Sequence, residues 1–162
     1  MTRDLSAWIE QHAVSSPDRV AIRFEGTEIS YRALHVRIQK TAGFLHNTHG
    51  IGRGDRVAYL GFNTPECVIS LFACARLGAV YLPLNWRLAL PELDHVLGHA
   101  EPKVLITDSP HRESAVRLVN GRSGCALIDH ANVVPVSEDS DTTLAESNFG
   151  GDPDVPLLLV YT

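Results

Sequence analysis

The chain has 162 residues, of which 44% are hydrophobic and 20% are charged, and its formal net charge is −5. This composition is typical of a globular protein with a sizeable core and argues against a disordered chain. The negative charge leaves no basic surface for nucleic acid, and no run reaches the about 18 apolar residues of a membrane-spanning helix. We therefore expect a folded domain that binds no nucleic acid and has no membrane segment.

The three cysteines are expected to be free thiols. Their number is odd, and the N-terminus lacks the long apolar core of a secretory signal. Both features favour a reducing compartment, so we predict a cytoplasmic protein. Cys67 and Cys74 lie seven residues apart in one expected helix, and we interpret them as packing residues rather than metal ligands.

The first third of the chain predicts a helix, a hairpin and a second helix. Apolar residues at helical spacing mark a helix over residues 5–15, which Ser15 and the following Ser-Pro end. Two short strands follow, at 20–24 and 28–30, with a Glu-Gly turn between them. Ser30 is suited to cap a helix that runs to about His49.

The glycine-rich stretch from Gly50 to Asp55 has the look of a phosphate-binding loop. A dinucleotide fingerprint, however, follows a strand and opens a helix. This stretch follows a helix and leads into a strand. We therefore interpret it as a glycine C-cap and a turn.

Residues 54–87 form the central unit of the prediction. A buried strand at 56–60 precedes a helix that begins near Pro65 and ends at Gly78, and a second strand occupies 79–82. Strand, crossover helix and parallel strand make one βαβ unit. The predicted inward face of the helix consists of Val68, Leu71, Phe72 and Ala75.

The alternation of strands and helices continues after this unit. A helix opens at Pro91, a strand spans 103–108, a helix spans 110–119, and a strand spans 126–128. This order predicts an α/β fold, a parallel sheet flanked by helices. We place this α/β subdomain at residues 1–130.

The last part of the chain differs in composition. Residues 131–154 are polar and acidic, and we predict a surface excursion there. Residues 155–162 form an apolar strand in which the chain stops. Because terminal residues are usually polar and frayed, we expect that the chain is a truncated piece of a longer protein.

Five stretches together resemble the N-terminal part of the acyl-CoA synthetase family, the adenylate-forming enzymes related to luciferases and to the adenylation domains of peptide synthetases. They are PDRVAIRFEGTEISYRAL, GDRVAYLGFNTPE, LFACARLGAVYLPLNWRL, PELDHVL and KVLITD. The order and spacing of the stretches carry the resemblance, which covers the chain from about Leu5 to Thr162. The Pro-Leu-Asn-Trp-Arg sequence is more similar to fatty or aromatic acyl-CoA ligases than to peptide-synthetase modules.

The resemblance implies the first subdomain of the adenylate-forming N-terminal domain. It also implies a function for the longer protein: a carboxylic acid is activated with ATP and Mg to an acyl-adenylate, and the acyl group then passes to coenzyme A. The phosphate-binding loop of the family follows a strand ending in Tyr-Thr, which matches Tyr161 and Thr162. Thr162 would thus be the first nucleotide-binding residue of that loop, and the rest of the loop is absent from this chain.

The resemblance also assigns one binding residue inside the chain. Arg87 matches an arginine that in some related ligases reaches the nucleotide phosphate of coenzyme A, and a guanidinium fork suits that contact. The other interpretation of Arg87 is a surface or capping arginine beside the helix that opens at Pro91. We assign no catalytic residue and no metal ligand within the 162 residues.

Two functions therefore remain open from the sequence. The first is the N-terminal portion of an acyl-CoA ligase that is inactive by itself and holds no ATP, Mg or coenzyme A alone. The second is a stand-alone interaction or dimerisation module on the same scaffold. In either case we expect self-association through exposed apolar surface.

His95 and His99 lie four residues apart on an expected helix, a spacing that occurs in zinc sites. No third ligand stands out near them, and no Glu follows His95 in the order of the helical metalloproteases. We interpret both as surface or packing histidines.

Overall fold

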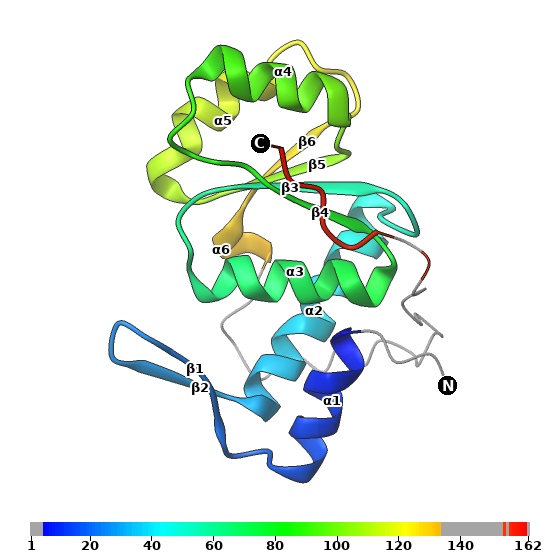
Figure 1. Ribbon diagram of the computed structural model, residues 1–162, viewed down its shortest axis with the longest axis vertical. Coiled ribbons are helices and arrows are strands. Elements are labelled where there is room, and N and C mark those ends of the chain that lie inside the picture. Colours follow the sequence, from blue (N-terminus) through cyan, green and yellow to red (C-terminus); the bar gives the residue numbers. More distant parts are fainter. Residues whose placement is uncertain (1–4, 134–153, 155, 162) are drawn as a thin grey trace.

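The structure is a computed structural model that describes residues 5–133, 154 and 156–161 (Figure 1). The N-terminal elements are α1 (Leu5–Ser15), β1 (Val20–Phe24), β2 (Thr27–Ser30) and α2 (Tyr31–His49). They confirm the predicted order of helix, hairpin and helix. The Oγ of Ser30 accepts a hydrogen bond from the backbone N of Ala33 at 3.2 Å, so this serine caps α2 as expected.

Four strands form a parallel sheet. They are β3 (Arg56–Leu60), β4 (Val80–Pro83), β5 (Val104–Thr107) and β6 (Ala126–Asp129). The strands lie side by side in the order β4-β3-β5-β6, and each neighbouring pair is parallel. Helix α3 (Pro65–Leu77) joins β3 to β4, so the predicted βαβ unit is confirmed.

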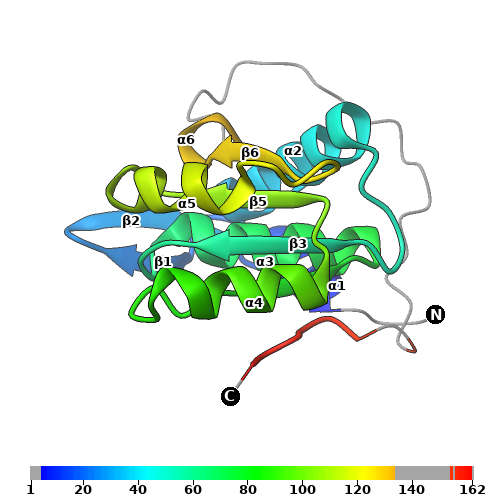
Figure 2. The same cartoon turned by 90° about the horizontal axis from the view of Figure 1, so that it is seen from above.

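Helices cover both faces of this sheet (Figures 1 and 2). Successive strand residues point to opposite faces, so Val57 and Tyr59 pack with α2 and α3, whereas Ala58 and Leu60 pack on the other side. The second face is covered by α4 (Leu90–Ala100) and α5 (Arg112–Val119). The sheet is therefore the middle layer of an α/β sandwich.

The buried face of α3 differs from the prediction. Of the residues expected to face the core, only Ala75 is buried, and Val68, Leu71 and Phe72 are half-buried. The deeply buried side chains of the helix are Ile69, Ser70, Ala73, Cys74 and Leu77.

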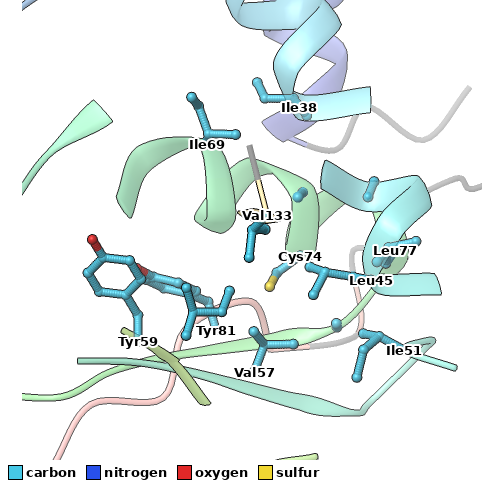
Figure 3. Packing of buried hydrophobic residues seen from close by; sticks show 14 of the residues in the cluster. Ile38, Leu45, Ile51, Val57, Tyr59, Ile69, Cys74, Leu77, Tyr81 and Val133 are labelled. Atoms are coloured by element: carbon cyan, nitrogen blue, oxygen red, sulfur yellow. The ribbon is translucent and has the colours of Figure 1, made fainter. Parts of the chain in front are cut away.

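The reason for this error is that α3 is apolar on most of its circumference. It packs against the sheet on one side and against α1 and α2 on the other, so periodicity alone cannot select the face turned to the sheet. Figure 3 shows Cys74 in the layer between α3 and Val57 of β3.

The connection after β5 contains two helical elements where one was predicted. The expected helix over 110–119 is split into a 3-10 turn at Ser109–His111 and α5. Asp108 caps this turn, because its carboxylate accepts a hydrogen bond from the backbone N of His111. A short helix, α6 (His130–Val133), follows β6 where the surface excursion was expected to begin.

The turn at 50–55 is confirmed as a helix cap and lies far from any strand's carboxyl end. Gly50 has the left-handed conformation with φ of 63°, and Ile51 beside it is buried. The backbone N of Gly54 donates to the carbonyl of Gly78 at 2.8 Å. The turn thus closes the amino end of β3 against the end of α3, away from the edge where such sheets bind ligands.

The apolar segment predicted at 155–162 pairs with β4 over a short distance. The backbone N of Tyr81 donates to the Leu157 carbonyl at 2.7 Å, and the N of Leu159 donates to the Tyr81 carbonyl at 3.0 Å. A single parallel bridge, Tyr81 to Leu158, marks the contact. The predicted excursion at 131–154 lies largely outside the described residues. Within the described part of the chain, no helix is long and apolar enough to span a membrane.

Candidate functional site

All four parallel strands end at one edge of the sheet, and the loops that follow them meet there. In open parallel sheets, ligands bind outside the carboxyl ends of the strands. The loop after β3 contains Gly61 and Phe62, the loop after β4 contains Trp86 and Arg87, and the loop after β5 contains Asp108. This edge is therefore the candidate site.

The buried carboxylate of Asp108 lies at the centre of the edge. Its side chain is 4% exposed, and its Oδ2 accepts a hydrogen bond from the backbone N of Phe62 at 2.8 Å. Its Oδ1 accepts one from the backbone N of His111 at 3.1 Å and lies 2.5 Å from Nδ1 of the same histidine. These charge-assisted contacts join the loops that follow β3 and β5.

Phe62, Trp86 and His111 form an aromatic cluster over this carboxylate. The ring centroids of Phe62 and Trp86 are 5.0 Å apart, and those of Phe62 and His111 are 4.7 Å apart, both edge to face. The Trp86 and His111 centroids are separated by 5.6 Å. Such geometries favour aromatic pairs beyond the area that they bury.

Arg87 lies on this cluster. Its Cζ is 4.5 Å from the centroid of the Trp86 ring, a cation–π contact, and its backbone N donates to Oδ1 of Asn85 at 3.1 Å. Arg87 is exposed, and among the described residues no carboxylate forms an ion pair with its guanidinium. The guanidinium thus has donors available for an anion at the carboxyl edge.

The N-cap of α4, Ala89, lies two residues beyond Arg87 and is bonded by a different side chain. The Oε2 of Glu92 accepts a hydrogen bond from the backbone N of Ala89 at 2.8 Å.

Thr162, the expected nucleotide-binding residue, lies outside the described residues. The residue before it is described: the hydroxyl of Tyr161 forms a hydrogen bond with Nδ1 of His99 on α4, and the two rings meet edge to face. The segment that leads to Thr162 is therefore held both by β4 and by α4.

The histidine pair His95 and His99 makes no metal site in the described part of the chain, where no group of three His, Cys, Asp or Glu residues is suited to hold a metal. Both side chains are exposed on α4. His99 contacts Tyr161 instead, a role that the sequence did not indicate.

The thiols near the β3–β4 pair are packing groups. Cys74 is fully buried, and Sγ of Cys67 lies 3.2 Å from the hydroxyl of Tyr81. Burial raises the pKa of the Cys74 thiol and of the Tyr81 hydroxyl above their ordinary values. Burial also raises the pKa of the Cys67 thiol. Neither thiol is a thiolate at neutral pH, which agrees with the interpretation of Cys67 and Cys74 as packing residues.

Sequence reasoning found Arg87 and missed the groups that surround it. One signal would have located Phe62, Asp108 and His111: each is the last residue of a predicted strand or lies within about three residues beyond one, at the same edge of a parallel sheet.

Two comparisons of sequence identify relatives. The model of the AMP-binding enzyme family matches residues 9–162. The chain is 45% identical over 105 residues to an indoleacetate–CoA ligase of Aromatoleum aromaticum, and 43% identical over 118 residues to a feruloyl-CoA synthase of Amycolatopsis. These matches cover 65% and 73% of the chain but only 20% and 24% of the relatives' length.

Solved structures have the same fold. The N-terminal domain of FACL13 from Mycobacterium tuberculosis matches with a TM-score of 0.82 at 24% identity, over 99% of this chain and 42% of that one. An o-succinylbenzoate CoA synthetase from Bacillus subtilis, solved with its acyl-adenylate intermediate, matches with a TM-score of 0.70 at 25% identity. That match covers 81% of this chain and 33% of the other.

We predict that Gly61→Ala destabilises the chain by about 1–3 kcal/mol, because overpacking a filled site costs that much. A Cβ on Gly61 would lie 2.9 Å from Cγ and Oδ2 of Asp108 and 3.1 Å from Cε1 of Tyr59. The matched control is Gly52→Ala, where no atom lies within 4 Å. Urea denaturation measures both variants, and equal midpoints for the two would contradict the prediction.

Proposed function

Since this chain belongs to the AMP-binding enzyme family, we propose that it is the N-terminal portion of an ATP-dependent acyl-CoA ligase. The single observation that carries this proposal is the match of the family model over residues 9–162. In the proposed reaction, a carboxylate attacks the α-phosphorus of ATP and pyrophosphate leaves. The thiol of coenzyme A then attacks the acyl carbonyl and AMP leaves.

We propose a fatty or aromatic carboxylic acid as the substrate. An aromatic acid is favoured, because the indoleacetate and ferulate named for the two relatives are both aromatic acids. Discrimination among such acids depends on the pocket that surrounds the acyl group. Within the described residues we assign no part of that pocket.

Arg87 is proposed to bind a phosphate of coenzyme A. Its exposed guanidinium fits an anion at the carboxyl edge, and no carboxylate within the described residues competes for it. Thr162 is proposed as the first residue of the nucleotide-binding loop. Mg is assigned to no residue, since the described residues offer no group of three His, Cys, Asp or Glu side chains for a metal.

We further propose that the 162 residues alone form no acyl-CoA. The purified chain, incubated with ATP, Mg, coenzyme A and a panel of aromatic and fatty acids, is expected to give no acyl-CoA above a heat-treated control. Formation of acyl-CoA that depends on ATP would contradict this.

The reading frame beyond Thr162 is expected to continue into a Ser-Gly-Thr-Thr-Gly loop, whereas a stop codon there would favour the stand-alone module.

Replacing Arg87 is expected to weaken the binding of coenzyme A by about 10- to 100-fold, because a lost charge-assisted hydrogen bond costs about 1.5–3 kcal/mol. Isothermal titration with coenzyme A uses the product of the complete reading frame that contains this chain, and compares the parent with Arg87→Ala and Arg87→Lys. Lysine keeps the charge without the fork and should lie between the two. Arg117→Ala removes an equal charge from the exposed face of α5 and serves as the control. Equal affinities for Arg87→Ala and Arg117→Ala would contradict the assignment.

The chain is also proposed to self-associate, with a second copy as the partner. Supporting this are large apolar side chains left exposed, among them Leu158 at 52% and Val160 at 55% on the segment beside β4. Sedimentation velocity should detect dimers or larger species, and Leu158→Asp should reduce their fraction. A monomer over the whole concentration range would contradict the proposal.

A further inference from the structure

The carboxylate of Asp108 connects two loops that are 46 residues apart in sequence. One contact goes to the backbone N of Phe62, and two go to the backbone and imidazole nitrogens of His111. The side chain of Asp108 is 4% exposed, so these donors replace water around the carboxylate. Removing the charge would leave buried donors without a matching acceptor, which is costly.

The two residues held by Asp108 both have rings that contact Trp86. The rings of Phe62 and His111 lie 5.0 Å and 5.6 Å from the Trp86 centroid. Phe62 and Trp86 are themselves 42% and 38% exposed, so no deep core fixes their orientation. Their positions depend on each other and on the loop anchored at Asp108.

The guanidinium of Arg87 packs on the ring of Trp86, and its Cζ lies 4.5 Å from the ring centroid. An exposed arginine has many rotamers, and ordering it on binding a ligand costs free energy. A fixed indole beneath it lowers that cost, because the guanidinium already rests at the carboxyl edge.

We propose that Asp108 is a positioning residue for Arg87, acting through Phe62, His111 and the Trp86 ring. The inference rests on the proposed role of Arg87 in binding a coenzyme A phosphate. It predicts that Asp108 influences affinity for coenzyme A without touching the ligand. A merely structural aspartate, one that only caps the turn after β5, would affect stability alone.

The test uses Trp86 as its own reporter. The chain has two tryptophans, so a Trp8→Phe background leaves Trp86 as the sole source of indole fluorescence. Asp108→Asn keeps the size of the side chain but removes its charge. Its amide NH2 group would then face an N–H donor of Phe62 or His111. Asp129→Asn is the matched control. Asp129 ends the neighbouring strand β6, and its Oδ1 accepts a hydrogen bond from the backbone N of Ala131 at 3.0 Å.

We expect Asp108→Asn to increase acrylamide quenching of Trp86 in the 162-residue chain. In the product of the complete reading frame it should weaken coenzyme A binding by about ten-fold, the lower end of what loss of an arginine contact costs. Asp129→Asn should change neither quantity. Unchanged quenching and unchanged affinity in a folded Asp108→Asn variant would overturn the proposal, even if its denaturation midpoint fell.

A second variant keeps the test decisive if Asp108→Asn does not fold. Phe62→Leu removes one ring from the cluster and leaves the carboxylate and its backbone donor in place. It should also raise Trp86 quenching and weaken coenzyme A binding, and no change in either would overturn the proposal.

The two proposals fail in different ways. If Arg87→Ala leaves the coenzyme A affinity of the complete protein unchanged while Asp108→Asn raises Trp86 quenching, the role of Arg87 fails and the positioning of Trp86 by Asp108 stands. If Arg87→Ala weakens binding while Asp108→Asn leaves quenching and affinity unchanged, the positioning role alone is overturned.

Discussion

A parallel sheet has to be covered on both of its faces, and this constraint governs most of the molecule. Each strand sends alternate residues to opposite sides, so β3 places Val57 and Tyr59 in one hydrophobic cluster and Ala58 and Leu60 in another. Helices supply the cover: α3 with α2 on one face, and α4 with α5 on the other. The loops then lie at the ends of the strands, and their polar side chains gather at the carboxyl ends.

At that edge, one buried charge organises an otherwise exposed surface. Asp108 is held by backbone and imidazole donors from two loops, and Gly61 is packed so closely against it that a methyl group has no room. The aromatic cluster of Phe62, Trp86 and His111 rests on this anchor and supports Arg87. The edge thus combines a rigid support with a cation that has donors available, which suits binding of a phosphate.

The order of the elements could be predicted from sequence because each signal is local. Ser30 as a cap, Gly50 and Gly78 as left-handed ends, and the short apolar strands all act within a few residues. The face of α3 could not be predicted, because a helix packed on two sides has no single apolar stripe. The site was only partly predictable for a similar reason. Arg87 came from family resemblance, while the contact between Phe62 and Asp108 exists only once β3 and β5 are side by side in register.

The most direct test of the ligase assignment is exchange of pyrophosphate into ATP, catalysed by the product of the complete reading frame that contains this chain. Exchange requires formation of an acyl-adenylate and does not depend on coenzyme A. We predict exchange that requires an added aromatic or fatty acid. A folded product that binds ATP but gives no exchange with any acid of either class would contradict the assignment.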